Sequence, residues 1–144
     1  MRRPEPGIAL VFTVVCVISL AACSRSFIVK PVGHFGQTIT FHFYESAKDK
    51  SPSKQRIVEF IVQEQKAEKE WIIVWALKGE QSLEAVVYGQ VYEGLKETAP
   101  AKPLGLKAKY RVLATNLPRF EPVGYAAALF EFDESGGVVM TSRH

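Results

Sequence analysis

The most reactive side chains in this sequence are the thiols of its two cysteines, Cys16 and Cys23. A thiol is a strong nucleophile only where it is accessible and ionises readily. Cys16 follows the bulky Val15 inside an apolar run, whereas Cys23 follows the small residues Ala21 and Ala22 at the end of that run. These surroundings favour a covalent modification of Cys23 and leave Cys16 as part of an apolar segment.

Other residues that perform chemistry do not form the patterns typical of enzymes. The histidines His34, His42 and His144 lack the His-x-x-x-His spacing, which places two zinc ligands on one helix face. No serine lies in a Gly-x-Ser-x-Gly turn, and no glycine-rich phosphate loop is present. We therefore expect no catalytic residues, no metal site and no cofactor, and we expect that the protein is not an enzyme.

The segment before Cys23 predicts an exported chain. Two arginines follow Met1, and residues 8–20 are apolar apart from one threonine and one serine. The apolar core of a signal peptide needs roughly 7–15 residues, whereas a membrane-spanning helix needs about 20. The shorter length favours a signal peptide over residues 1–22, and the alternative is an uncleaved anchor helix.

The last residues of this segment identify the kind of signal. The sequence Leu20-Ala21-Ala22-Cys23 resembles the lipobox of bacterial lipoproteins, in which an aliphatic residue and two small residues precede a cysteine. The resemblance implies cleavage before Cys23, a diacylglycerol on its sulfur and a fatty acyl group on the new amine. Two or more acyl chains hold a protein stably on a membrane without a spanning helix. Ser24 is not the aspartate that retains such lipoproteins in the inner membrane, so the resemblance implies an outer-membrane protein that faces the periplasm.

The composition fits one folded domain behind this signal. The chain has 144 residues, 47% of them hydrophobic, and 18 Lys and Arg against 15 Asp and Glu. The apolar content excludes a disordered chain, and the weak, scattered positive charge does not indicate a nucleic-acid partner. Cleavage and lipidation leave no free thiol, so the mature chain forms no disulfide. We predict a lipidated tether over residues 23–26 and one domain over residues 27–144.

The predicted domain consists of β-strands, because its apolar residues mostly recur with a period of two. The run at residues 71–77 is apolar throughout, which predicts a strand covered on both faces. In the strand at residues 56–63, the alternation places Val58, Phe60 and Val62 on one face. The remaining predicted strands cover residues 27–32, 37–44, 83–88, 106–114, 125–133 and 138–141. About seven or eight short strands without an amphipathic helix favour a single antiparallel β-sandwich.

One strand carries a more specific signal. The spacing from Leu104 to Tyr110, with Val112 and Ala114 following, resembles the tyrosine corner of immunoglobulin-like and fibronectin type III domains. In that corner the tyrosine hydroxyl bonds the backbone a few residues upstream. The resemblance implies an immunoglobulin-like or fibronectin type III-like sandwich, with Trp71 or Trp75 as its inner tryptophan.

A long connection over residues 88–103 is the candidate interaction loop. Loops longer than about 12 residues are uncommon and often functional. Tyrosine suits interfaces because it joins apolar area to a polar tip. The loop residues that we assign to a possible interaction are Tyr88, Gly89, Tyr92 and Gly94. The alternative is a crossover between sheets whose tyrosines cover the core.

Two hypotheses of function remain after these exclusions. In the first, a lipid on Cys23 tethers a small β-sandwich that binds an envelope protein as an accessory module. In the second, the domain is a periplasmic sensor or carrier that holds a small ligand in an aromatic pocket. Such a pocket would be lined by residues from the set Phe41, Phe43, Phe60, Trp71 and Trp75.

Overall fold

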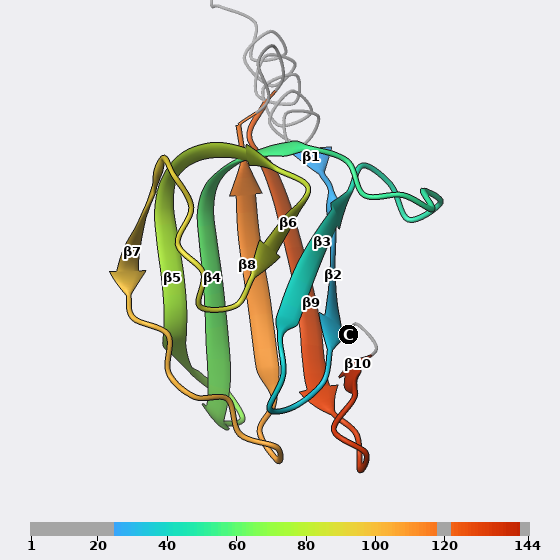
Figure 1. Ribbon diagram of the computed structural model, residues 1–144, viewed down its shortest axis with the longest axis vertical. Coiled ribbons are helices and arrows are strands. Elements are labelled where there is room, and N and C mark those ends of the chain that lie inside the picture. Colours follow the sequence, from blue (N-terminus) through green and yellow to red (C-terminus); the bar gives the residue numbers. More distant parts are fainter. Residues whose placement is uncertain (1–24, 118–121, 142–144) are drawn as a thin grey trace, which may run out of the picture.

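The computed structural model describes residues 25–117 and 122–141, and every regular element in them is a β-strand (Figure 1). The signal peptide, the lipobox residues, Cys23 and His144 lie outside the described residues. The strands are β1 (Arg25–Ser26), β2 (Ile28–Gly33), β3 (Ile39–Tyr44), β4 (Gln55–Ala67), β5 (Glu70–Leu83), β6 (Ala85–Val87), β7 (Leu95–Ala99), β8 (Tyr110–Asn116), β9 (Gly124–Phe132) and β10 (Val138–Met140).

The strands form two sheets that pack face to face as a sandwich (Figure 1). The larger sheet has seven strands in the order β1-β9-β8-β4-β5-β7, and β10 also pairs with β9. The smaller sheet has the order β2-β3-β6. The strand pairs are antiparallel except for β1 and β9, which are parallel. The predicted antiparallel β-sandwich is confirmed at this level.

Ten strands are present in the described residues, more than the predicted number, because two short strands lie where we expected irregular chain. Arg25 and Ser26, which we assigned to the tether, pair with Gly124 and Tyr125 of β9. Residues of the expected 88–103 loop form β7, which pairs with β5. Strand β7 carries mainly charged and small residues, so its sequence lacks the apolar alternation that marks a buried strand.

The core between the sheets is a cluster of aromatic rings. Phe41 of β3 lies 5.2 Å from Phe60 of β4 and 5.6 Å from Phe130 of β9, measured between ring centroids. Phe60 also contacts Trp75 of β5 at 5.7 Å, with an edge-to-face geometry. Rings at these separations and angles pack favourably beyond their burial alone. The aromatic cluster therefore joins the two sheets at their centres.

Two bulges correct the predicted strand faces. The pairing of β4 with β8 skips Val58, so Ile57, Phe60 and Val62 are fully buried on one face while Val58 is only half-buried. A bulge adds one residue to a strand and reverses the alternation beyond it, which is why placing Val58 with Phe60 was wrong.

The second bulge lies in β5 and divides the apolar run 71–77. The register with β4 passes from Trp75 directly to Ile73, which leaves Val74 without a partner in β4. Val74 and Trp75 are buried, whereas Ile73 is 43% exposed. The prediction of burial on both faces therefore holds for residues 74–77 but is wrong for the start of the run.

Candidate protein-docking face

The two tyrosines of the predicted interaction loop are bonded within the domain. The ring of Tyr88 packs edge-to-face on Trp75 at 5.1 Å, and its hydroxyl donates to the carbonyl oxygen of Lys102 at 2.6 Å. Burial raises the pKa of Tyr88 to about 12. The hydroxyl of Tyr92 accepts a hydrogen bond from the backbone N–H of Val87 at 2.8 Å, at the edge of β6.

The two glycines of the same loop shape its turns. Gly89 and Gly94 each have φ of +84°, a conformation that favours glycine. The carbonyl oxygen of Gly94 accepts a hydrogen bond from the N–H of Glu80 at 2.9 Å, so the loop is fixed against β5. Together with the tyrosine contacts, this geometry favours the alternative in which residues 88–103 form a crossover that covers the core.

His34 and Asp133 stabilise the turn at residues 133–137, whereas His42 lies within β3. The Nε2 atom of His34 lies 2.8 Å from the carbonyl oxygen of Ser135. Asp133 accepts hydrogen bonds from the hydroxyl and N–H of Ser135 and from the N–H of Gly137, and the hydroxyl bond is the main reason that the pKa of Asp133 lies below its ordinary value. Within residues 25–117 and 122–141, no three His, Cys, Asp or Glu side chains gather in a metal-binding group.

The tyrosine hydroxyl of the predicted corner forms the expected type of contact. Tyr110 is buried at the start of β8, and its hydroxyl accepts a hydrogen bond from the N–H of Gly105 at 2.5 Å. Burial raises the pKa of Tyr110. The predicted strand 106–114 begins only at Tyr110, and Leu106, the first residue of the predicted range, is 40% exposed. Residues 105–109 therefore precede β8, with a turn at residues 106–107, and are not the first part of the strand.

A more open surface lies on the outer face of the seven-stranded sheet, on the side opposite the aromatic core. Cross-strand register places Ile61 of β4, Leu113 of β8 and Ala127 of β9 in one row. These positions alternate along their strands with the fully buried or nearly buried residues of the inner face. We call the outer side of β5, β4, β8 and β9 the docking face.

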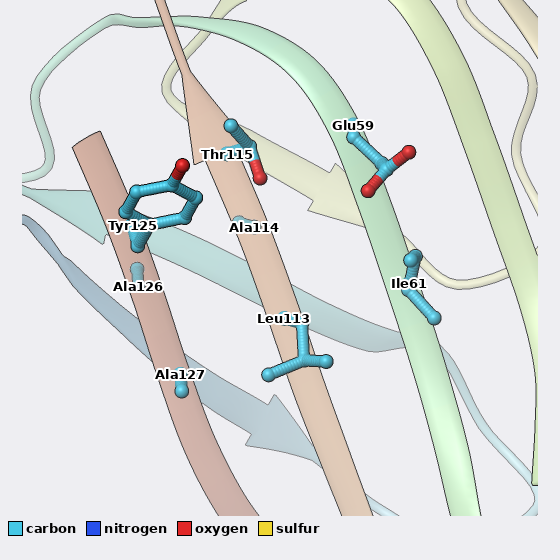
Figure 2. Close-up of a pocket in the computed structure, with 8 residues that line it drawn as sticks. All are labelled: Glu59, Ile61, Leu113, Ala114, Thr115, Tyr125, Ala126 and Ala127. Carbon is cyan, nitrogen blue, oxygen red and sulfur yellow. The ribbon is translucent and has the colours of Figure 1, made fainter. Parts of the chain in front are cut away.

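A shallow groove of about 350 Å³ crosses this face (Figure 2). Its floor is made by small residues of β8 and β9, and Leu113 and Ile61 rise beside each other from neighbouring strands. Tyr125 stands at one end, 58% exposed, beside Thr115. The groove residues are Glu59, Ile61, Leu113, Ala114, Thr115, Tyr125, Ala126 and Ala127. Because alanine covers little of the backbone, the sheet presents a flat apolar strip here.

A second group of side chains borders the strip. The guanidinium of Arg111 lies 4.4 Å from the ring centroid of Trp71, and its Nε donates to Oε1 of Gln63 at 2.8 Å. Stacking on an indole and a hydrogen bond to an amide hold the cation flat against the sheet. Trp71, which was one of the expected pocket residues, therefore belongs to the docking face and not to the core.

The outward-facing residues of β9 indicate this face, although the patterns of catalytic and loop residues in the sequence do not. Period-two alternation in the predicted strand 125–133 places Ala126, Ala128, Phe130 and Phe132 on one face, and all four are buried. The intervening Tyr125, Ala127 and Leu129 are also apolar or aromatic, although alternation assigns them to solvent. Apolar residues at such positions are the mark of a second contact surface.

Comparison of the chain with protein-family models, with curated proteins and with solved structures finds no match. The described residues contain no helix with the length and apolar character needed to cross a membrane.

Proposed function

We propose that this chain is a lipid-anchored envelope protein whose β-sandwich is an interaction module, and that the docking face binds its partner. The observation that carries the proposal is the apolar strip across β4, β8 and β9, where Ile61 and Leu113 are half-buried and Ala127 is exposed although their neighbours on the same strands are buried. Contiguous apolar patches on a folded domain mark interaction sites. The proposal includes no catalytic chemistry.

The lipobox supports the anchor, and the start of β1 supports its position. Only Cys23 and Ser24 separate the predicted cleavage site from Arg25, which pairs with Gly124. Since an extended residue spans at most about 3.6 Å, two residues of chain are too short to carry a lipid on Cys23 far from β1. A lipid on Cys23 would hold this end of the sheet at the membrane surface. The serine after Cys23 supports the outer membrane as the location.

The fold proposed for this module is an immunoglobulin-like or fibronectin type III-like sandwich. The contact between the Tyr110 hydroxyl and Gly105 supports it, as does the burial of Trp75 in the larger sheet. Domains of this kind commonly serve recognition at cell surfaces.

The second hypothesis, a small-ligand carrier, is favoured by one observation only. The groove volume of about 350 Å³ falls within the usual range for ligand sites, about 300–1,000 Å³. However, Phe41, Phe43, Phe60 and Trp75 fill the core and do not line this groove. A small ligand would therefore lie on an open strip of aliphatic side chains, a setting better suited to a protein surface.

Photo-crosslinking in intact membranes tests the docking face. A photoreactive phenylalanine analogue would replace Tyr125 in the full chain, and the control would carry it at Val91, which is 53% exposed and lies in the 88–94 loop. We expect a discrete adduct from position 125 and none from position 91. Adducts from neither position, or equal adducts from both, would contradict the docking face.

The anchor is tested separately with a Cys23→Ala variant. We expect this variant to leave the membrane fraction, because the diacylglycerol requires the thiol. If the variant sediments with membranes like the unmodified chain, the lipoprotein assignment is wrong.

A further inference from the structure

The docking face has an ordered arrangement that narrows the choice of partner. Cross-strand register places its outward residues in three rows that each run across β5, β4, β8 and β9. The first row is Lys78, Glu59, Thr115 and Tyr125, the second is Ala76, Ile61, Leu113 and Ala127, and the third is Ile73, Gln63, Arg111 and Leu129.

We propose that the partner of this face is a second copy of the same chain, packed face to face with its strands running in the same direction. The inference rests on the proposed function, because it uses the same face and the same anchor. A two-fold axis that runs along the strands between β4 and β8 generates this dimer. The axis places β4 opposite the partner's β8 and β5 opposite the partner's β9. Each row therefore faces the same row of the partner, with the order of its residues reversed.

The apolar residues match under this operation. Ile61 meets the partner's Leu113 beside the axis, and both are half-buried aliphatic residues. Ile73 meets the partner's Leu129 in the next row. The small, nearly buried Ala76 meets the partner's Ala127, which lets the two sheets approach on both flanks of the axis. Facing sheets pack at about 10 Å with interdigitating side chains, and this pattern of large and small residues suits such packing.

The polar residues match as well, and no like charges meet. Glu59 faces the hydroxyl of the partner's Thr115, which can donate to a carboxylate. Arg111 faces the amide of the partner's Gln63, the same type of group that its Nε binds within its own chain. Lys78 faces the ring of the partner's Tyr125, where an ammonium is attracted to the aromatic face. The arrangement is therefore self-complementary, as a two-fold interface requires.

The opposite arrangement, with the strands of the two copies antiparallel, fits less well. An axis across the strands would place Lys78 against the partner's Ile73 and Tyr125 against the partner's Leu129. It would also put the two β1 strands, and so the two Cys23 anchors, at opposite ends of the dimer. Two copies in one membrane need both anchors at the same end, which only the parallel arrangement provides.

Crosslinking of two differently tagged variants in native membranes tests this pairing. One full chain carries Lys78→Cys and the other Tyr125→Cys, and a short bismaleimide joins nearby thiols. Within one chain these positions lie three strand spacings apart, about 14 Å, so only facing copies bring them together. Because docked thiols meet at a millimolar effective concentration, we expect about tenfold more mixed adduct than from Lys78→Cys with the control Val91→Cys.

A second variant tests whether contact through this face causes the adduct. Ala127→Arg adds an exposed side chain that a folded monomer accommodates but that the partner's Ala76 cannot. We expect it to lower the mixed adduct by roughly tenfold or more, since an interface that buries an unpaired charge is strongly weakened. The matched control is Ala101→Arg at an exposed loop position, which should leave the adduct unchanged.

The outcomes separate this inference from the proposed function. Equal mixed adducts from the Tyr125→Cys and Val91→Cys mixtures would overturn the dimer. An adduct of position 125 with a different envelope protein would also overturn it while leaving the docking face intact. An adduct from chains without an introduced cysteine would show that Cys16 or Cys23 remains as a free thiol, which contradicts the cleaved and lipidated anchor and not the packing.

Discussion

The two faces of the seven-stranded sheet are built from the same strands but from different side chains. The inner face carries Phe60, Trp75 and Tyr110, which are at most 1% exposed and packed against further rings. The outer face carries alanine, aliphatic and polar residues, and of its two rings Tyr125 is 58% exposed and Trp71 is half-buried. The inner face is thus completed within the domain, whereas the proposed dimer would complete the outer face with another molecule.

This difference separates residues that specify the fold from residues available for binding. Interlocked rings tolerate little change of shape, because a packed interior cannot fill the space left by a deleted ring. A flat aliphatic strip makes fewer contacts within its own chain, so substitutions there leave the fold intact. Unfolding measurements on variants of the two faces test this separation, from the largest expected effect to the smallest.

The two tryptophans of β5 give the sharpest contrast, because the bulge at Val74 places them on opposite faces. We expect Trp75→Ala to lower the free energy of unfolding by about 3–5 kcal/mol, the usual cost of deleting a buried aromatic ring. Trp71→Ala removes a half-buried ring that contacts Arg111, and we expect a loss of about 1 kcal/mol. Urea unfolding of the full chain in detergent measures both values.

Equal losses from the two tryptophan variants would contradict the comparison. Such a result would mean that Trp71 is as deeply packed as Trp75, and that the outer side of β5 is completed within the monomer.

The hydroxyl of Tyr110, on the inner face, bonds the backbone of Gly105 in the segment before β8. Tyr110→Phe keeps the ring on Phe130 but removes the acceptor for the N–H of Gly105. We expect a loss of about 1–1.5 kcal/mol, near the upper end for a single hydrogen bond. Thermal unfolding with a Tyr125→Phe control separates the corner from a general effect of losing a phenol. A loss no larger than that of the control would mean that the hydroxyl does not stabilise the corner.

These two cases also show how far the sequence predicts the fold. Period-two alternation predicted β3, β9 and the part of the 106–114 strand that starts at Tyr110, because these stretches contain no bulge. The spacing around Tyr110 predicted its hydrogen bond, because that contact is local. The same alternation failed at Val58 and in the 71–77 run, since one extra residue moves every following side chain to the other face and leaves no mark in the residue types.

The candidate site was harder to predict than the fold. The tyrosines at 88 and 92 suggested an interaction loop by their type, but their hydroxyls bond the carbonyl of Lys102 and the N–H of Val87, and the residue type alone does not predict such contacts. The docking face depends on the register of four strands, which the sequence of any one strand does not contain. What could be predicted is that Ile61, Leu113 and Ala127 stand at positions where solvent-facing residues were expected.

Tyr88 belongs to the inner group through its contact with Trp75, and its effect depends on pH. We expect Tyr88→Phe to lose about 0.5–1 kcal/mol near pH 8, from the hydrogen bond to Lys102. The phenol in the folded state has a pKa raised from 10.0 to about 12, so the unfolded chain releases this proton first. The contribution is complete below pH 10 and declines as the pH rises toward 12.

The difference in free energy of unfolding between the unmodified chain and Tyr88→Phe should therefore become smaller as the pH rises from about 8 to about 11. Denaturant unfolding at the two pH values measures it, and the variant itself is the reference for the other tyrosines. A gap that stays constant would show that Tyr88 is accessible enough to ionise in the folded domain.

The smallest effect on folding is expected at Ile73, on the same strand as Trp75 but on the docking face. Ile73→Thr keeps the β-branch and removes exposed apolar area, so the free energy of unfolding of the dilute monomer should change by no more than about 0.5 kcal/mol. Calorimetry in dilute detergent measures this value, and the crosslinked fraction in membranes should fall, because Ile73 meets the partner's Leu129. A loss of stability near that of Trp75→Ala would place Ile73 in the core of the monomer. In that case the outer side of β5 would no longer belong to the docking face.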